Sequence, residues 1–243
     1  MDQINRINPL LEILKSSPRR VNKILLQKEE GHRPLGIIVG LAKTNHIPYL
    51  FVPKQVLDKA SPHHQGVVAH LASKEYISLE RILTDAGPSP FLVLLDEIED
   101  PQNLGAILRS AEGAGADGVV IPERRSAGLT ETVFEVSAGA LEHLRVARVP
   151  NLAQAMETLK ERGFWLIGAE GEGEGFFYEF DYTQPVAVIL GSEGRGLRHL
   201  TRKKCDRILT IPMRGKVNSL NVASAASVFF FEVARQRTPR SGR

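Results

Sequence analysis

The sequence predicts an α/β protein of two domains, because strand-like and helix-like segments alternate along the chain and a proline-rich break divides them. The break is Gly87-Pro88-Ser89-Pro90, which ends a polar stretch over residues 72–89. A chain of 243 residues can hold one large domain or two modest ones. We therefore expect a small domain over residues 1–72, a linker over 73–89 and a larger domain over 90–243.

Helices and strands alternate in the expected first domain. Asn8 and Pro9 are typical of an N-cap and a first-turn proline. The expected elements are, in order, a helix through Lys15, a strand over Val21–Leu26, a helix over Arg33–Lys43, a strand over Tyr49–Val52, a helix from Pro53 to Lys59 and a strand over Gly66–His70. This alternation fits a small α/β domain.

The second domain begins with Phe91–Asp96, a continuous apolar run typical of a strand buried on both faces of a parallel sheet. Further strands are expected over Gly118–Ile121, Arg145–Val149, Phe164–Ala169, Val186–Leu190 and Ile208–Ile211. Helices are expected over Leu104–Ala114, over Leu152–Arg162 with Asn151 as N-cap, and over Asn218–Arg237. The pattern favours a parallel sheet covered by helices.

Composition limits the class of protein. Hydrophobic residues make up 42% and charged residues 24%, as in ordinary globular proteins. No apolar run approaches the roughly 20 residues that span a bilayer, and the N-terminus has no signal-peptide pattern. The single cysteine, Cys205, allows neither an internal disulfide nor a Cys-x-x-Cys zinc pattern, and the adjacent His63 and His64 lack metal-ligand geometry. We expect a cytoplasmic protein without metal or membrane partner.

Charge is distributed unevenly along the chain. Lys and Arg number 12 against 8 Asp and Glu in residues 1–86, 7 against 18 in 87–194, and 12 against 2 in 195–243. Such asymmetry indicates a basic face for a polyanion. The alternative is that the acidic middle and the basic C-terminal stretch neutralise each other in the fold, and charge alone leaves the two equally supported.

Two glycine-rich segments compete as a ligand loop. Gly171–Gly175 has the spacing of a dinucleotide-binding loop. However, no helix-like segment follows it, its two glutamates would repel a phosphate, and too little chain remains for two nucleotide-binding halves. We interpret it as a flexible acidic loop. Gly191–Gly196 follows a buried strand and precedes a helix-like segment, so it is the better ligand loop, although a tight structural turn explains it equally well.

Three segments carry a family resemblance: Asn103-Leu-Gly-Ala-Ile-Leu-Arg-Ser-Ala111, Ile189-Leu-Gly-Ser-Glu-Gly-Arg-Gly196 and Ile211-Pro-Met-Arg-Gly-Lys-Val-Asn-Ser-Leu-Asn-Val-Ala223. In this order they resemble the three motifs of the SpoU/TrmH class of SPOUT RNA methyltransferases, and the resemblance covers roughly residues 90–237. It implies transfer of a methyl group from S-adenosylmethionine to a ribose 2'-hydroxyl, and a deep trefoil knot in the C-terminal domain. Ala223 departs from the family, where serine is common.

The resemblance also implies which residues bind the methyl donor. It places main-chain contacts at Gly191, Ile211 and Leu220, with Leu190 and Met213 nearby. Ala169, at the end of the preceding strand, is a weaker candidate. Taken alone, Met213 is equally explained as a core residue.

The catalytic residues implied by the resemblance are Arg109, Asn103, Glu193, Ser219 and Asn221. In similar enzymes the arginine comes from the neighbouring subunit, which implies a homodimer. A guanidinium stays protonated, so we expect Arg109 to hold phosphate and a developing alkoxide rather than to accept the proton. The alternatives are an ion pair between Arg109 and Glu112, and helix capping by Ser219 and Asn221.

Residues 1–72 resemble the ribosomal-protein-like domain that precedes the catalytic domain in ribosomal members of this class, with His64–Ala69 as the local marker. This implies an RNA-binding domain and a guanosine of 23S ribosomal RNA as target, with tRNA as the alternative. Arg19, Arg20, Lys23 and Lys28 could contact phosphate or form only a solvated face. A non-catalytic RNA-binding protein of the same fold is the alternative from another class.

Overall fold

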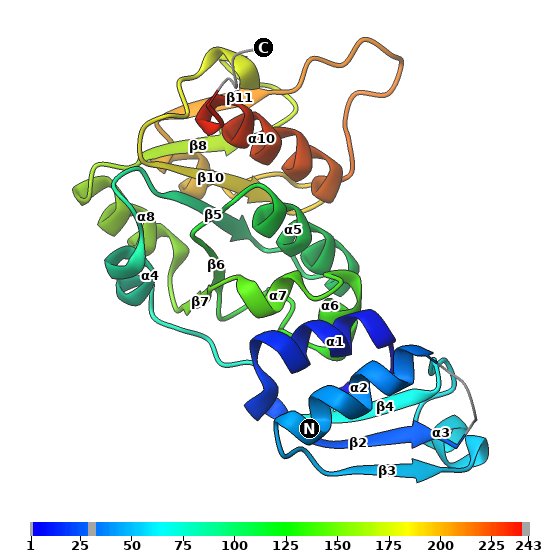
Figure 1. Cartoon of the computed structure of the whole chain (residues 1–243). Coiled ribbons are helices and arrows are strands. Elements are labelled where there is room, and N and C mark those ends of the chain that lie inside the picture. Colours follow the sequence, from blue (N-terminus) through cyan, green and yellow to red (C-terminus); the bar gives the residue numbers. More distant parts are fainter. Residues whose placement is uncertain (1, 29–32, 240–243) are drawn as a thin grey trace. The chain divides into compact units, whose positions relative to one another are not determined.

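A computed structural model of the chain describes residues 2–28 and 33–239, and these form two compact units (Figure 1). The N-terminal unit consists of the residues up to Glu75 together with Leu129–His143. The C-terminal unit consists of Tyr76–Gly128 and Leu144 onward. The residues that carry the three motifs all belong to the C-terminal unit.

A four-stranded mixed sheet forms the N-terminal unit, in the order β1-β4-β2-β3. The strands are β1 (Asp2–Ile4), β2 (Val21–Gln27), β3 (Tyr49–Val52) and β4 (Val67–Leu71). The helices are α1 (Ile7–Ser16), α2 (Arg33–Thr44), α3 (Lys54–Ala60), α6 (Glu131–Val136) and α7 (Ala140–His143), with the 3-10 turn η1 (Pro18–Arg20). The alternation expected from the sequence is present, and β1 was not predicted.

The segment Leu129–His143 packs on the N-terminal residues although it lies far along the chain. The Arg20 guanidinium lies 4.8 Å from the centre of the Phe134 ring and forms an ion pair with Glu142. The carboxylate of Glu142 is fully enclosed, so Arg20 supplies the charge partner that a buried carboxylate requires. Arg20 is thus a structural residue of this unit rather than a free RNA contact.

Seven parallel strands form the sheet of the C-terminal unit, in the order β7-β6-β5-β10-β8-β11-β9. They are β5 (Phe91–Asp96), β6 (Gly118–Pro122), β7 (Val146–Val149), β8 (Trp165–Ala169), β9 (Gly175–Phe176), β10 (Val186–Gly191) and β11 (Arg207–Thr210). Every residue of β5, β6 and β10 is buried, which explains their continuous apolar sequences. The predicted α/β class with a parallel sheet is confirmed.

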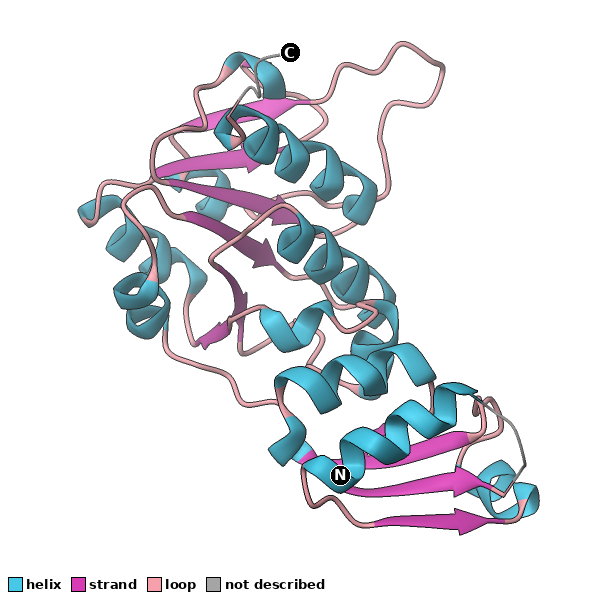
Figure 2. Ribbon diagram, viewed as in Figure 1, coloured by secondary structure: helices cyan, strands magenta, loops and turns pink. Residues whose placement is uncertain are grey.

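Helices cover both faces of this sheet (Figure 2). On one face, α5 (Pro101–Gly113) packs against α10 (Val222–Arg237), and the Phe230 ring of α10 meets the Phe91 ring edge-on at 5.6 Å. On the other face, α4 (Leu79–Asp85) and α8 (Leu152–Glu161) pack on a core that includes Leu92 and Leu94, and α9 (His199–Lys204) packs against α8. The 3-10 turn η2 (Phe177–Glu179) follows β9.

Several predicted boundaries differ from the structure. Residues 79–85, expected in a linker, form α4, because Leu79 and Ile82 are buried in the core. Helix α10 begins at Val222 rather than Asn218, and α1 is preceded by Arg6 as N-cap rather than Asn8. Asn151 caps α8 as predicted. Among the described residues, no helix is long and apolar enough to cross a membrane.

Candidate functional site

The candidate site lies where the strands of the C-terminal sheet end. Strands β8, β10 and β11 run in parallel, so their carboxyl ends at Ala169, Gly191 and Thr210 meet at one edge of the sheet. The loops after these strands, with the start of α10, line a pocket of about 720 Å³. Ligands of open α/β sheets bind at this edge, and the volume is ordinary for a small-molecule site.

The turn after β10 depends on its glycines. A side chain on Gly191 would lie only 2.1 Å from the main chain of Gly196, and Gly194 and Gly196 have φ values of 80° and 66°. Main-chain hydrogen bonds of 3.1 and 2.9 Å join Ser192 and Gly196 across the turn. The sequence Gly-Ser-Glu-Gly-Arg-Gly therefore fixes a tight turn that keeps its main chain next to the pocket.

All the residues predicted to bind the donor line this pocket: Leu190, Gly191, Ile211, Met213 and Leu220, with the weaker candidate Ala169. Lining one pocket does not test whether these residues bind the donor, so their donor-binding roles stay a prediction. Met213 is 37% exposed and Leu220 is 40% exposed, so neither is a core residue. Apolar side chains at a pocket wall suit a flat aromatic ligand group.

The acidic loop after β8 contributes a wall that sequence analysis missed. Glu170, Gly171 and Glu172 line the pocket, and the neighbouring strand adds Thr210. Two signals were present: their position directly after a buried strand, and the glycine spacing of Gly171–Gly175, which we interpreted as a flexible acidic loop rather than a ligand loop. Every charged residue among the lining is a carboxylate, namely Glu170, Glu172 and Glu193. Glu170 is paired with Arg202, whereas Glu172 and Glu193 have no ion pair among the described residues, so these two suit the pocket to a ligand that carries positive charge.

Three of the five predicted catalytic residues form one hydrogen-bonded cluster. The Asn103 side-chain amide donates to a Glu193 oxygen at 3.2 Å, and the Asn221 amide donates to Asn103 Oδ1 at 2.9 Å. A third, longer contact of 3.5 Å joins the Asn221 amide to Glu193. The cluster brings together one residue from each of the three motifs, at the edge of the pocket.

Asn221 and Ser219 differ in their local roles. The Asn221 side chain accepts a hydrogen bond from the main-chain N–H of Ala223 at 2.9 Å, so it caps α10 as well as joining the cluster. Ser219 lies in the loop before the helix and lines the pocket, without a capping bond. The capping alternative therefore applies to Asn221 only.

Arg109 lies apart from the cluster. It is exposed on α5 and lines neither the pocket of about 720 Å³ nor the smaller pocket that adjoins it. Within the described part of the chain it has no ion pair, so the alternative of a bridge to Glu112 is not formed. Its guanidinium is available to a ligand or to another molecule.

A second pocket of about 270 Å³ adjoins the first. It is lined by Glu97, Ile98, Glu99, Asp100, Asn103, Ser192, Glu193, Arg195 and Val222. Glu97 is buried and has a φ of 63°, which is unusual for a residue with a side chain. Its carboxylate is held by Arg125 at 3.2 Å and Arg198 at 3.5 Å.

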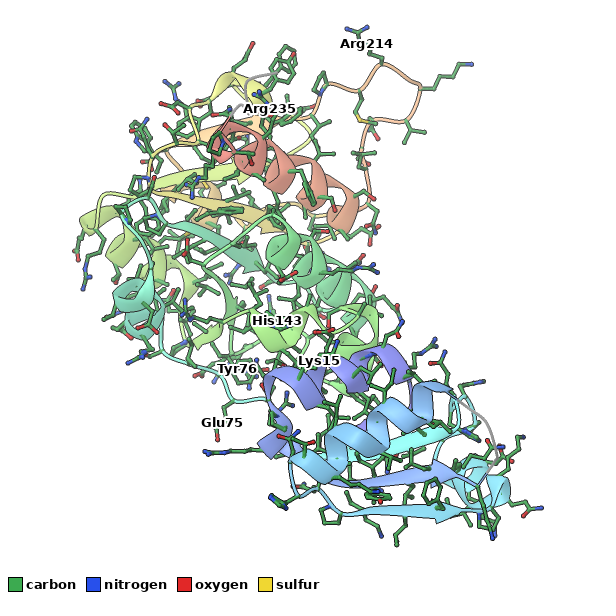
Figure 3. All side chains as sticks on the ribbon, in the orientation of Figure 1. Lys15, Glu75, Tyr76, His143, Arg214 and Arg235 are labelled. Atoms are coloured by element: carbon green, nitrogen blue, oxygen red, sulfur yellow. The ribbon has the colours of Figure 1, made fainter. Side chains whose placement is uncertain are left out.

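Internal ion pairs neutralise much of the positive charge of the C-terminal stretch. Arg198 binds the buried carboxylate of Asp96 at 2.6 Å, and this hydrogen bonding raises the pKa of Arg198. Further pairs join the acidic middle of the chain to the basic stretch: Arg202 with Glu170, Lys204 with Glu157, and Arg207 with Glu174 at 3.8 Å. The neutralisation alternative thus holds for α9 and its neighbours. In contrast, Arg214 extends from the outer end of the loop over 211–221 (Figure 3).

This fold and site define the class: a parallel α/β protein with a ligand pocket at the carboxyl ends of its strands, where the three motif segments meet. The chain belongs to the SpoU rRNA Methylase family, whose sequence profile matches residues 90–231. A second profile, described as RNA 2'-O ribose methyltransferase substrate binding, matches residues 7–77. The predicted family and enzyme class are confirmed.

Relatives along nearly the whole chain support the assignment. A Bacillus subtilis protein of the TrmH family of tRNA/rRNA methyltransferases, YacO, is 42% identical over 96% of this chain and 94% of its own. The 23S rRNA (guanosine-2'-O-)-methyltransferase RlmB of Pseudomonas putida is 38% identical over 98% and 97%. The SpoU methyltransferase AviRb of Streptomyces viridochromogenes, solved with AdoMet, superposes with a TM-score of 0.82 at 26% identity, covering 97% and 90%.

Proposed function

We propose that the protein transfers a methyl group from S-adenosylmethionine to the 2'-hydroxyl of a guanosine in 23S ribosomal RNA. The observation that carries this proposal is the Asn103–Glu193–Asn221 cluster, which joins the three motifs at the edge of the larger pocket. The choice of ribosomal RNA and guanosine is supported by the similarity to RlmB over nearly the whole chain.

The larger pocket fits S-adenosylmethionine in shape and charge. Leu190, Ile211 and Met213 offer apolar surface for an adenine ring, and the turn at Gly191 offers main-chain groups. The lining carboxylates suit a sulfonium cation. When bound there, S-adenosylmethionine supplies an electrophilic methyl group. The protein's own task is to place a ribose hydroxyl in line with that methyl group at near-attack distance.

We assign Arg109 to the RNA rather than to the donor. Its guanidinium can bind the phosphate beside the target ribose and stabilise negative charge on the oxygen as its proton leaves. Asn103, Glu193 and Asn221 restrain one another, so they can present a fixed set of donors and acceptors to the nucleotide. Ser219 lies at the same pocket and adds a hydroxyl.

We propose that the active form is a homodimer in which Arg109 serves the neighbouring subunit's site. Arg109 is exposed and lacks an ion pair among the residues that the structure describes. Helix α10 packs beside α5 and leaves Phe231 53% exposed, with its ring near Gly113, one helical turn after Arg109. A partner subunit on this pair of helices would cover the aromatic side chain and receive the unpaired guanidinium.

The trefoil knot and the domain roles belong to the same proposal. The knot is proposed from the family to which the chain belongs, and it concerns the segment that contains the turn over 191–196 and the loop over 211–221, both of which line the larger pocket. We propose that residues 1–72 bind RNA, as the substrate-binding profile suggests. Arg19, Lys23 and Lys28 are the candidates, because each is exposed and has no ion pair within the described chain.

A methyl-transfer assay tests the proposal. The full chain is incubated with labelled S-adenosylmethionine and either 23S ribosomal RNA or total tRNA transcribed without modification. Label in 2'-O-methylguanosine of 23S RNA supports it. Label in tRNA alone would favour the tRNA alternative, suggested by the naming of the Bacillus subtilis relative. Donor binding without transfer to either RNA would favour a non-catalytic RNA-binding protein.

A subunit-mixing experiment tests the shared site. One chain carries Arg109→Ala, and the other carries Gly191→Val, which blocks the donor turn because even a Cβ atom has no room there. Each parent dimer should be inactive, and mixed dimers should regain part of the activity. Mixed dimers that form and stay inactive would contradict the shared site.

A further inference from the structure

The smaller pocket lies beside the pocket proposed for the donor, and Ser192, Glu193 and Val222 line both. If the larger pocket holds the methyl donor, the target ribose must lie directly next to it. The base attached to that ribose must also lie within a few ångströms of the donor pocket, and the smaller pocket is the adjoining hollow that can receive it. This inference rests on the proposed function, and it concerns how the base is selected.

Most of the carboxylates around the smaller pocket are already bound within the protein. Glu97 is held by two arginines, Asp100 accepts from a main-chain N–H at the start of α5, and Glu193 accepts from two asparagine amides. Glu99 is exposed at the pocket and, over the described ranges, forms no hydrogen bond or ion pair. It is the carboxylate that remains available to a ligand.

Arg195 adds a positively charged side chain to the lining of the smaller pocket. It is exposed in the turn after β10, and it has no hydrogen bond or ion pair to any residue that the structure describes. The pocket therefore offers two uncommitted charged groups. One is a pure acceptor and the other is a pure donor.

We propose that Glu99 and Arg195 select guanine as the target base. Guanine carries two adjacent donors, N1–H and the N2 amino group, and its next two positions, O6 and N7, are acceptors. A carboxylate can accept from both donors at once, and a guanidinium is the preferred partner of O6 and N7. In the smaller pocket, Glu99 is the free acceptor for the two donors of guanine, and Arg195 is the free donor for its two acceptors.

Other bases do not match. Adenine presents an acceptor at N1, where Glu99 offers only acceptors, and an amino group at position 6, where Arg195 offers only donors. Cytosine has two acceptors beside its amino group, and uracil has one donor between two acceptors. Each leaves a charged side chain facing a group of the wrong kind, and so loses the hydrogen bonds to charged groups that guanine makes.

The experiment compares wild type with Glu99→Gln, Arg195→Met and the control Glu161→Gln. Glu161 is exposed on α8, outside both pockets. The methylated nucleotide is first mapped on in vitro transcribed 23S RNA. Short RNAs are then made with guanosine, inosine or adenosine at that position. Inosine lacks only the N2 amino group, so it isolates one contact to Glu99.

Wild type and Glu161→Gln should methylate guanosine about 10- to 100-fold faster than inosine, as expected for a lost hydrogen bond to a charged group. Glu99→Gln should reduce this ratio to below about threefold, with unchanged affinity for S-adenosylmethionine. Arg195→Met should slow guanosine transfer while keeping the guanosine-to-inosine ratio. An unaltered ratio in Glu99→Gln, with 2'-O-methylguanosine still formed, would overturn the base selection and leave the proposed function standing. If wild type methylates no RNA, both fail together.

Discussion

Two groups of basic residues come from the same C-terminal stretch and differ in what they contact. The first group, on and around α9, consists of Arg198, Arg202, Lys204 and Arg207, and every member has a carboxylate partner. The second group, on the motif loops, consists of Arg195, Arg214 and Lys216, and none has an ion pair within the described residues. Basic residues of one stretch therefore serve two purposes. Some stabilise the fold through internal ion pairs, and others leave positive charge available at the site.

The difference shows why a basic stretch is poor evidence for a nucleic-acid surface. Of the excess charge in residues 195–243, the part on α9 neutralises the acidic segment between 87 and 194. Only the unpaired part remains free to attract a polyanion without first breaking an internal pair. Arg109, although it lies in the acidic segment, is likewise exposed and has no ion pair among the described residues.

The largest effect is expected at Arg109, where an unpaired cation is assigned to the chemistry. Arg109→Ala should lower methyl transfer by about 100-fold or more, because a group that stabilises charge on the reacting oxygen is lost. Affinity for S-adenosylmethionine, measured by calorimetry, should stay near the wild-type value, because Arg109 does not line the larger pocket. Near-normal turnover would remove Arg109 from the site.

The next effect is expected at Arg198, the member of the paired group whose carboxylate partner, Asp96, is the most deeply buried. Arg198→Ala leaves Asp96, which is 1% exposed, without its charge partner, while the main-chain N–H of residue 198 still donates to it. Because the guanidinium is itself half-exposed, we expect a loss of about 1–2 kcal/mol in the free energy of unfolding. Denaturant unfolding measures this, and Lys203→Ala, an exposed change without an ion pair, is the control. Equal stability of the two variants would contradict the comparison.

Much of the fold could be predicted because its signals are local. A continuous apolar run predicts strand β5, and the capping side chain of Asn151 predicts the start of α8. Helix α4 was missed because its polar residues resemble a linker, and only its contacts with the core show that Leu79 and Ile82 are buried. Packing of Leu129–His143 on the N-terminal unit has no local signal, since it depends on distant residues such as Arg20.

The candidate site was predicted in part for the same reason. The motif resemblance named Asn103, Glu193 and Asn221, and the structure brings them within hydrogen-bonding distance. It did not indicate Glu170 or Glu172, because the acidic glycine loop matches no motif of the family. The sequence also could not show which arginines form ion pairs, since pairing depends on which strand ends lie together in the fold.

A smaller effect is expected from the unpaired loop charges. The double variant Arg214→Ala/Lys216→Ala should fold with wild-type stability, because both side chains are exposed and lack ion pairs within the chain as described. RNA binding should weaken, and the slope of log affinity against log salt should fall by about 1.4, or roughly 0.7 per lost phosphate contact. Filter binding at several salt concentrations checks this. An unchanged slope would mean that the loop charges are only solvated.

The smallest effect on RNA binding is expected in the N-terminal unit, where paired and unpaired basic residues again lie within a few positions of each other. Lys23 is exposed without an ion pair in the described residues, whereas Arg20 binds the enclosed carboxylate of Glu142. Deleting residues 1–72 would confuse the two roles, because it would also uncover α6 and α7, which pack on this unit. Single substitutions keep them apart.

Lys23→Ala should reduce the salt slope of RNA binding by about 0.7 and weaken binding a few-fold, with stability unchanged. Arg20→Ala should instead lower the free energy of unfolding by about 2–3 kcal/mol, because the Glu142 carboxylate loses its charge partner in a buried site. Its salt slope should match wild type when binding is measured well below the unfolding temperature. If Lys23→Ala leaves the slope unchanged while Arg20→Ala lowers it, the paired arginine would be the RNA contact. The separation between paired and available charge would then fail in this unit.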